Sequence, residues 1–193
     1  SEHRPFFLIS TAAAIFTCVF AFQSGLLTAI LDEYQMNRIY AWIDPEEFPL
    51  SNGFQVLQGL YAIGAGGLFG TGLGNSLQKL GFLPEAQNDM IFSIVCEELG
   101  LVGAGTIIVL FLILIWRFFV IATHAPDLFG ALIAVGAMAH MMIQVILNIA
   151  VVTNSIPNTG ITLPFISYGG TSVVFLLLEM GLVPVSYTHL RAH

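Results

Sequence analysis

Charged side chains are scarce in this sequence. They make up 9% of its 193 residues, whereas a soluble globular domain is about one quarter charged. Hydrophobic residues account for 56% of the chain, and its mean hydropathy is +0.87. This composition excludes an ordinary soluble domain and predicts an integral membrane protein.

Cysteine and positive charge are also rare. The two cysteines, Cys18 and Cys96, are too few for a disulfide framework or a cysteine-rich metal site. Five Lys and Arg residues stand against twelve Asp and Glu residues, which gives a net charge of -7. A chain this acidic is not expected to bind nucleic acid.

Long hydrophobic runs, in contrast, are abundant. A helix needs about 20 apolar residues to cross a hydrocarbon core of about 30 Å. Four stretches meet this need: residues 5–30, 101–120, 128–152 and 171–185. The first is too long for the hydrophobic region of a signal peptide and lacks a cleavage site. We therefore expect an all-α polytopic membrane protein with about four transmembrane helices.

The distribution of charge predicts the orientation of these spans. Nine of the twelve acidic residues lie between positions 32 and 98, whereas Arg4, Arg117 and Arg191 fall on the other side if the spans alternate. Because basic residues favour the cytoplasmic side, we expect both chain ends in the cytoplasm and the acidic stretch outside.

The predicted spans leave two external segments. Residues 31–100 are too apolar and glycine-rich for a solvated tail, so we expect short helices and tight turns that fold back against the membrane. Residues 153–170 contain prolines and glycines typical of a structured loop. Residues 1–184 are thus expected to form one membrane domain. Residues 185–193 change character after Pro184, which should interrupt the last span, and we expect a non-native tail there.

The stretch GAGGLFGTGLGNS, residues 64–76, invites a phosphate-loop interpretation. No strand is expected before it and no Lys-Ser/Thr follows, so that interpretation is weak. The spacing of Gly66, Gly70 and Gly74 instead favours close packing of backbone against a neighbouring helix.

His140, Gln144 and Asn148 recur every four residues and should form one polar stripe on the third span. Hydrogen bonding between helices is the favoured interpretation, and the lining of a functional cavity is the alternative. Glu179 is the carboxylate expected inside the last span, either as a functional group or as a partner for His140.

The segment SYGGTS, residues 167–172, precedes the last span. Thr171 or Ser172 is the expected N-cap, which leaves backbone N–H groups pointing outwards. Simple helix capping and docking of a lipid-linked diphosphate are both compatible with this arrangement.

The segment FLPEAQNDMIFSIVCEELG, residues 82–100, places four acids beside very apolar sequence. Asp89 could cap a helix that starts at Met90, or Asp89 or Glu85 could act as a base. Glu97 and Glu98 stand at the far end of that helix, where its dipole disfavours acids. Partial burial at the membrane boundary would raise a carboxyl pKa towards a value useful for proton abstraction.

Four stretches carry a family resemblance: RIYAWIDP (38–45), QVLQGLYAIGAGGLFGTGLGNS (55–76), LPEAQNDMIFSIVCEELGLVGA (83–104) and PNTGITLPFISYGGTS (157–172). Together they closely resemble the SEDS family of shape, elongation, division and sporulation proteins, typified by RodA, FtsW and SpoVE. The resemblance runs from about residue 5 to residue 182. Family members have about ten transmembrane helices, so this chain resembles their C-terminal part.

The resemblance implies an enzyme of the bacterial cytoplasmic membrane, a peptidoglycan glycosyltransferase. The family polymerises lipid II, an undecaprenyl-diphosphate-linked precursor, and works with a class B penicillin-binding protein. Its essential acid maps onto Asp89, which would be the general base of an inverting transfer. Gln87 stands where many members have His, so a role for that His does not carry over.

The expected site has further members. Substrate-binding candidates are Arg38, Lys79, Glu85, Gln87, Ser167, Tyr168, Gly169, Gly170 and Thr171. Supporting candidates are Glu97, Glu98, His140, Gln144, Asn148 and Glu179. Glu85, Glu97 and Glu98 could raise the pKa of Asp89 or help hold a divalent cation near the diphosphate. The alternative function is a transporter or flippase of the lipid-linked precursor, with Glu179 and the stripe as a proton path.

Overall fold

The computed structural model describes residues 33–47, 52–80, 83–125 and 127–188, and every regular element in them is a helix. These elements are α3 (Glu33–Ile43), α4 (Asn52–Gly66), the short 3-10 helix η1 (Gln78–Leu80), α5 (Ile91–Thr123), α6 (Leu128–Val152) and α7 (Gly170–Thr188). The predicted span at 5–30 and Cys18 lie outside the described residues.

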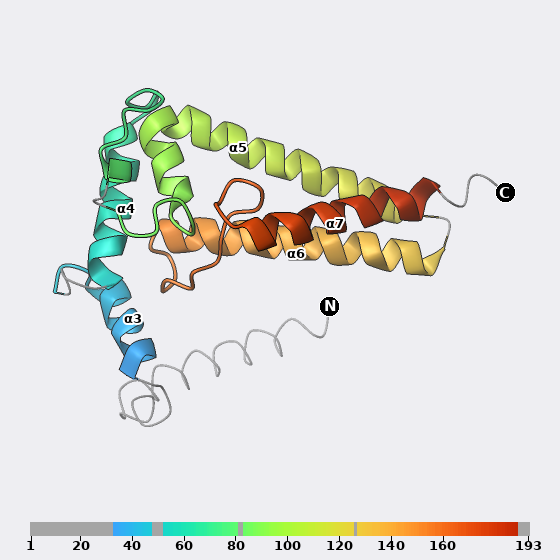
Figure 1. Ribbon diagram of the computed structural model, residues 1–193, viewed down its shortest axis with the longest axis horizontal. Coiled ribbons are helices and arrows are strands. Elements are labelled where there is room, and N and C mark those ends of the chain that lie inside the picture. Colours follow the sequence, from blue (N-terminus) through green and yellow to red (C-terminus); the bar gives the residue numbers. More distant parts are fainter. Residues whose placement is uncertain (1–32, 48–51, 81–82, 126, 189–193) are drawn as a thin grey trace, which may run out of the picture.

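Three long helices, α5, α6 and α7, run side by side with alternating direction, and α3 and α4 lie across one end of them (Figure 1). Two of the described helices, α5 and α6, are long and apolar enough to cross a membrane, with hydropathies of 2.6 and 1.9. The predicted spans 101–120 and 128–152 fall within them. The apolar part of α7, Gly170–Val183, is shorter. The prediction of an all-α membrane protein is confirmed.

Gly100 divides α5 into two parts. Its φ of 68° and ψ of -169° are not helical, and its positive φ is one that glycine adopts readily. The segment before it turns away from the long part that starts at Leu101, as Figure 1 shows. The long part of α5 therefore begins at Leu101, which is also the first residue of the predicted span 101–120.

Close backbone packing joins α4 to this turn. A side-chain carbon on Gly66 would collide with the backbone of Cys96, and one on Gly70 with the backbone of Glu98. The prediction of close packing is confirmed for these two glycines. It is wrong for Gly74, where an added side-chain carbon would meet open space, because only the backbone of this residue faces α5, through a hydrogen bond to Glu98.

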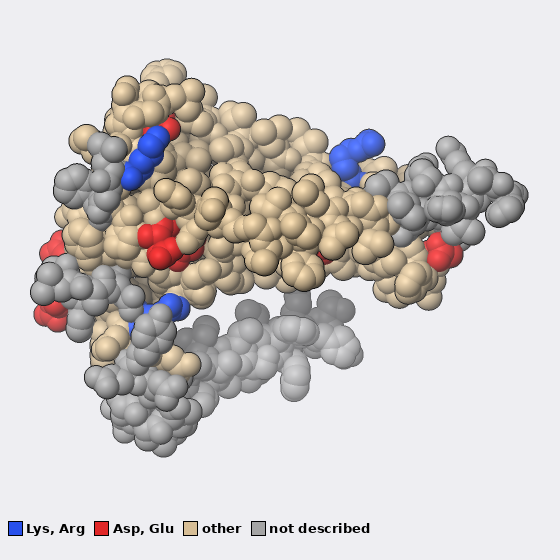
Figure 2. All heavy atoms as spheres, viewed as in Figure 1, with Lys and Arg blue, Asp and Glu red and all other residues tan. Residues whose placement is uncertain are grey.

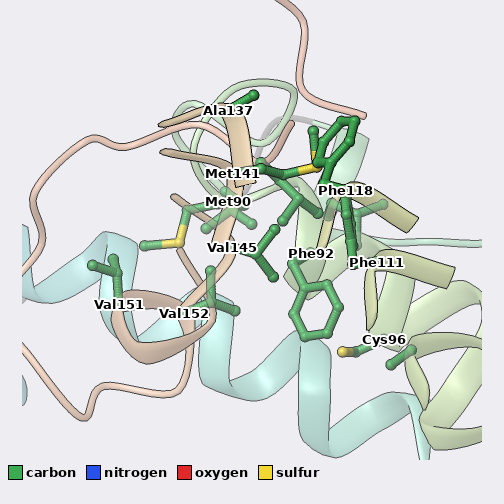
Figure 3. Close-up of a cluster of buried hydrophobic side chains, with 14 of the residues drawn as sticks. Met90, Phe92, Cys96, Phe111, Phe118, Ala137, Met141, Val145, Val151 and Val152 are labelled. Atoms are coloured by element: carbon green, nitrogen blue, oxygen red, sulfur yellow. The ribbon is translucent and has the colours of Figure 1, made fainter. Parts of the chain in front are cut away.

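The core between α5 and α6 contains Phe111 and Phe118 from α5 and Met141 and Val145 from α6 (Figure 3). The outer faces of these helices are apolar as well, and Trp116 is 63% exposed. Apolar side chains on both the inner and outer faces are what a helix in lipid requires.

Helix α7 differs from expectation at its end. It continues through Pro184 to Thr188, so the predicted interruption at Pro184 is wrong. Proline removes one backbone donor, and in apolar surroundings ending the helix there would leave several more groups unpaired. The boundary between native sequence and tail at residue 185 stays a prediction.

The two segments predicted to be external lie at the same end of the helix bundle. That end carries α3, α4, the loop after α6 and most of the visible acidic side chains (Figure 2). The side of the membrane that it faces stays a prediction.

Candidate functional site

Asp89 lies in a turn that leads into α5. Glu85 in this turn has a φ of 53°, and Asn88 N donates to Glu85 O at 2.9 Å. Helix α5 begins at Ile91, and its N-cap is Met90, with no capping hydrogen bond from a side chain. The hypothesis that Asp89 caps this helix is therefore wrong, because its carboxylate is directed to other partners.

Three segments far apart in the sequence meet at Asp89, which is 7% exposed. Gln55 Nε2 from α4 donates to Asp89 Oδ1 at 3.4 Å. Asn148 Nδ2 from α6 donates to the Asp89 carbonyl at 2.8 Å and to the Ile161 carbonyl at 2.8 Å. The carboxylate is thus fixed at the junction of α4, α6 and the loop after α6.

The surroundings of Asp89 raise its pKa. Burial is the main cause, and the negative charge of Glu85 raises it further. Hydrogen bonds from its own backbone and from Asn158, and the positive charge of Arg38, act in the opposite direction. The net result is a carboxyl group that binds a proton more readily than a free aspartate.

Arg38 connects α3 to this junction. Its Nη1 donates to the Asn158 carbonyl at 2.9 Å, which brings a positive charge close enough to affect Asp89. A second bond, from Trp42 Nε1 to the Asn154 carbonyl at 3.0 Å, ties α3 to the same loop. The two segments predicted to be external are therefore joined directly.

Two depressions lie beside the Asp89 turn. One, of about 370 Å³, is lined by Lys79, Leu83, Glu85, Ala86, Gln87, Asn88 and Tyr168. The other, of about 510 Å³, is lined by Gln87, Ile91, Ile166, Ser167, Tyr168, Gly169, Gly170 and Val173. Tyr168 N donates to the Gln87 carbonyl at 2.8 Å, so these two residues separate a more polar depression from a more apolar one.

The structure therefore brings together seven of the nine predicted substrate-binding residues around these depressions. Arg38 and Thr171 line neither depression, and Arg38 instead donates to the Asn158 carbonyl. Asp89 is among the lining residues of neither depression.

The start of α7 differs from the predicted cap. The helix begins at Gly170, and Val173 N donates to the Gly169 carbonyl at 3.0 Å. Thr171 and Ser172 thus lie in the first turn, and the prediction that either is the N-cap is wrong, since the chain becomes helical one residue earlier. Ser167 Oγ stabilises the preceding loop by accepting from Leu163 N at 2.7 Å.

Glu97 and Glu98 have structural partners. Glu97 is 2% exposed, accepts from Leu77 N at 3.0 Å and also accepts from Ser76 Oγ. Glu98 forms an ion pair with Lys79 at 3.0 Å. Neither is among the charges that raise the pKa of Asp89, so that prediction is wrong for them and right for Glu85. The glycine-rich loop, which is the part of residues 64–76 after α4, thus folds back towards α5. Residues at its end and just after it bind both carboxylates.

The described residues contain no cluster of three or more His, Cys, Asp or Glu side chains placed to hold a metal ion. A divalent cation at Glu97 and Glu98 therefore gains no support from the geometry. Lys79, although paired with Glu98, keeps 46% of its side chain exposed and lines the more polar depression.

The polar stripe on α6 is used for contacts within the protein. His140 Nδ1 lies 2.9 Å from Glu179 Oε2 on α7, and Gln144 Nε2 lies 3.5 Å from Thr162 Oγ1. Together with the two bonds of Asn148, these contacts favour the hydrogen-bonding interpretation of the stripe. Asn148 is also the member that reaches the Asp89 turn.

Gln55 and Asn158 were missed by sequence reasoning, which concentrated on charged residues. Asn158 Nδ2 donates to Gln55 Oε1 at 3.0 Å across a sequence separation of 103 residues. One signal was available for Gln55: it shares a helix face with Gly59 and Ala62, which are buried. A polar side chain on a buried face needs a partner.

The fold and this site define an all-helical membrane protein with a buried, elevated-pKa carboxylate at one end of its helix bundle. The family model of FtsW, RodA and SpoVE, described as cell cycle protein, matches residues 5–191. The chain belongs to this family and is a bacterial membrane protein.

Individual relatives agree with this assignment. Stage V sporulation protein E of Bacillus subtilis is 51% identical over 161 residues, which are 83% of this chain and 44% of that protein. A probable peptidoglycan glycosyltransferase FtsW of Thioalkalivibrio is 46% identical over 78% of this chain and 38% of that protein. The chain thus spans less than half the length of these relatives.

A solved structure is also similar. It is described as the structural coordination of polymerization and crosslinking by a peptidoglycan synthase complex. The match has a TM-score of 0.62 and 32% identity, and it covers 91% of this chain and 50% of that chain.

Proposed function

We propose that the protein containing this chain is a peptidoglycan glycosyltransferase that polymerises lipid II, with Asp89 as general base. The observation that carries the proposal is the buried carboxylate of Asp89, whose pKa is raised by burial and by Glu85. A base must bind a proton in the transition state and release it afterwards, and a raised pKa makes an aspartate better suited to that task. The FtsW relatives, named as probable peptidoglycan glycosyltransferases, support the same activity.

In this proposal the hydroxyl oxygen of the acceptor sugar attacks the anomeric carbon of a donor sugar. The bond from that carbon to the diphosphate breaks, its electron pair leaves with the diphosphate, and the hydroxyl proton passes to Asp89. Attack on the face opposite the leaving group inverts the anomeric centre, as in inverting glycosidases with a hydroxyl in place of water.

The depressions beside Asp89 have the chemistry for an amphipathic substrate. The more polar one presents Lys79, Glu85 and Gln87 to sugar or peptide groups. The other is bordered by Ser167, Gly169 and Gly170 at the start of α7, where free backbone N–H groups favour an anion such as a diphosphate. Tyr168 would lie between them.

Two basic residues are candidates to neutralise the leaving diphosphate. Lys79 is bound to Glu98 but half-exposed, and Arg38 is bound to the Asn158 carbonyl. Thr171, in the first turn of α7, would extend the anion site. These roles follow from charge and position.

We infer that the enzyme lies in the bacterial cytoplasmic membrane as a multi-pass protein, with residues 31–100 and 153–170 on the outer side. The end of the bundle that carries α3, α4 and the start of α5, which Asp89 precedes by two residues, also carries most of the visible acidic side chains (Figures 1 and 2). A class B penicillin-binding protein is the proposed partner, supported by the similar chain from a complex that couples polymerization with crosslinking.

The test uses the intact protein with its cross-linking partner and labelled lipid II. Wild type is expected to form glycan polymer on a gel. Asp89→Asn is expected to bind lipid II, unfold at the temperature of wild type and form polymer at least about 100-fold more slowly. Polymer from Asp89→Asn at the wild-type rate would refute the proposed base.

A transporter of the lipid-linked precursor is the competing function, since His140 and Glu179 form a pair between α6 and α7 of the kind found in proton paths. It predicts that Glu179→Gln abolishes transport of lipid II and that Asp89→Asn has no effect. The glycosyltransferase proposal expects polymer from Glu179→Gln. Running both variants in both assays separates the two functions.

A further inference from the structure

Two side-chain amides, those of Gln55 and Asn158, surround the Asp89 carboxylate. Gln55 comes from α4 and Asn158 from the loop after α6, and both are buried, at 8% exposed each. Gln55 donates to Asp89, and Asn158 donates to Gln55. A hydrogen bond from Asn158 also lowers the pKa of the Asp89 carboxyl.

The orientation of both amides is fixed by the backbone. Gly160 N donates to Asn158 Oδ1 at 2.9 Å, so Asn158 must direct its Nδ2 donor elsewhere. That donor meets Gln55 Oε1 at 3.0 Å. Because the oxygen of Gln55 is occupied, its Nε2 faces Asp89 Oδ1 and the Pro84 carbonyl, each at 3.4 Å.

A chain of hydrogen bonds, here called the relay, therefore runs from Gly160 N through the side chains of Asn158 and Gln55 to the Asp89 carboxylate. Arg38 Nη1 binds the backbone carbonyl of Asn158 at 2.9 Å and so helps to hold this residue in place. In an amide side chain the nitrogen donates and the oxygen accepts. Each amide here faces a donor on one side and an acceptor on the other, so only one orientation of each satisfies its neighbours.

We propose that Gln55 is a positioning residue for Asp89, held in its donor orientation by Asn158. The proposal rests on the proposed function, in which Asp89 is the base. Gln55 would bind one oxygen of the carboxylate and leave the other to receive the hydroxyl proton. Its donated bond favours the ionised form of Asp89, the form that can accept a proton, against the effect of burial.

The test measures single-turnover consumption of labelled lipid II against pH, using the intact protein with its partner. Gln55→Met keeps the length of the side chain and removes both polar groups. Loss of a hydrogen bond to a charged group should raise the pKa of Asp89 by about one unit. The acidic limb of the profile is therefore expected to move about one pH unit higher, with about a ten-fold loss of rate below it.

A second variant tests the relay through a different residue. Asn158→Leu keeps the shape of the side chain, adds no charge beside Asp89 and removes the donor that holds Gln55 Oε1. Gln55 then loses the contact that fixes its amide, and Asp89 loses its bond from Asn158, so the limb is expected to move in the same direction. Gln58→Met, on the same helix, is the control and should leave the limb at its wild-type position.

The outcomes separate the two proposals. A purely structural role for Gln55 would lower the rate by the same factor at every pH and leave the limb unmoved, which would overturn the inference. If the acidic limb of the pH profile stays in place in both variants and Asp89→Asn is inactive, the positioning role of Gln55 is wrong. The proposal that Asp89 is the base would then still stand. Full activity of Asp89→Asn would instead refute the proposed function.

Discussion

Asp89 and the pair Glu97 and Glu98 lie on the same short stretch of chain and have opposite environments. Asp89 is surrounded by neutral amides and by the like charge of Glu85, and its pKa is raised. Glu97 binds Ser76 and the backbone of Leu77, and Glu98 binds Lys79.

The difference shows how a fold assigns separate tasks to neighbouring acids. Strong donors hold Glu97 and Glu98 in place, so these carboxylates fasten the glycine-rich loop to α5. Asp89 instead has Gln55 Nε2 at 3.4 Å from its Oδ1, and the hydrogen bonds from its own backbone and from Asn158 do not outweigh its burial, so its pKa stays raised. A carboxylate held by weaker bonds is the better proton acceptor.

The largest expected effect separates the two groups by activity. Asp89→Asn should reduce lipid II polymerisation by about 100-fold or more, because a general base contributes about that much. Glu97→Gln keeps an acceptor oxygen for Leu77 or Ser76 and should keep most of its activity per folded molecule. Equal losses in the two variants, measured on gels and corrected for folded protein, would erase the proposed distinction.

The next effect separates them by stability. Glu97→Ala leaves the Ser76 hydroxyl and the Leu77 N–H without their acceptor in a buried site. An unsatisfied buried donor costs about 1–3 kcal/mol, so the unfolding temperature of the purified intact protein should fall clearly. Asp89→Asn, measured beside it, should remain close to wild type, and a reversed order would contradict the assignment.

A smaller effect is expected for the ion pair of Glu98 with Lys79. Lys79 is 46% exposed, and such pairs contribute about 0–1 kcal/mol. Glu98→Gln should therefore lower the unfolding temperature only slightly, and the difference from wild type should shrink at high salt because exposed charges are screened. A loss as large as that of Glu97→Ala would show that the pair is more important than its exposure indicates.

Much of this fold follows from local sequence. The long apolar runs predicted the spans within α5 and α6, and the spacing of Gly66 and Gly70 predicted close packing on α5. Each of these features depends on the chemistry of a single segment. The partial burial expected near the membrane boundary also predicted the raised pKa of Asp89.

The contacts of the site could not be predicted in the same way. Asn148 meets the Asp89 carbonyl across 59 residues, and Gln55 meets Asn158 across 103 residues. Such pairs depend on where α4 and the loop after α6 are placed in space. The partners of Glu97 likewise exist only because the glycine-rich loop folds back, which no local pattern of charge revealed.

The most direct test of the account is the pH dependence of single-turnover polymerisation by the intact protein with its cross-linking partner. A base acts when deprotonated, so the rate should rise as pH rises through the pKa of Asp89. Burial and Glu85 raise that pKa from 3.8, so the acidic limb should lie above that value, and Glu85→Gln should move it to lower pH. A rate independent of pH in this range, or a limb unmoved by Glu85→Gln, would contradict the account.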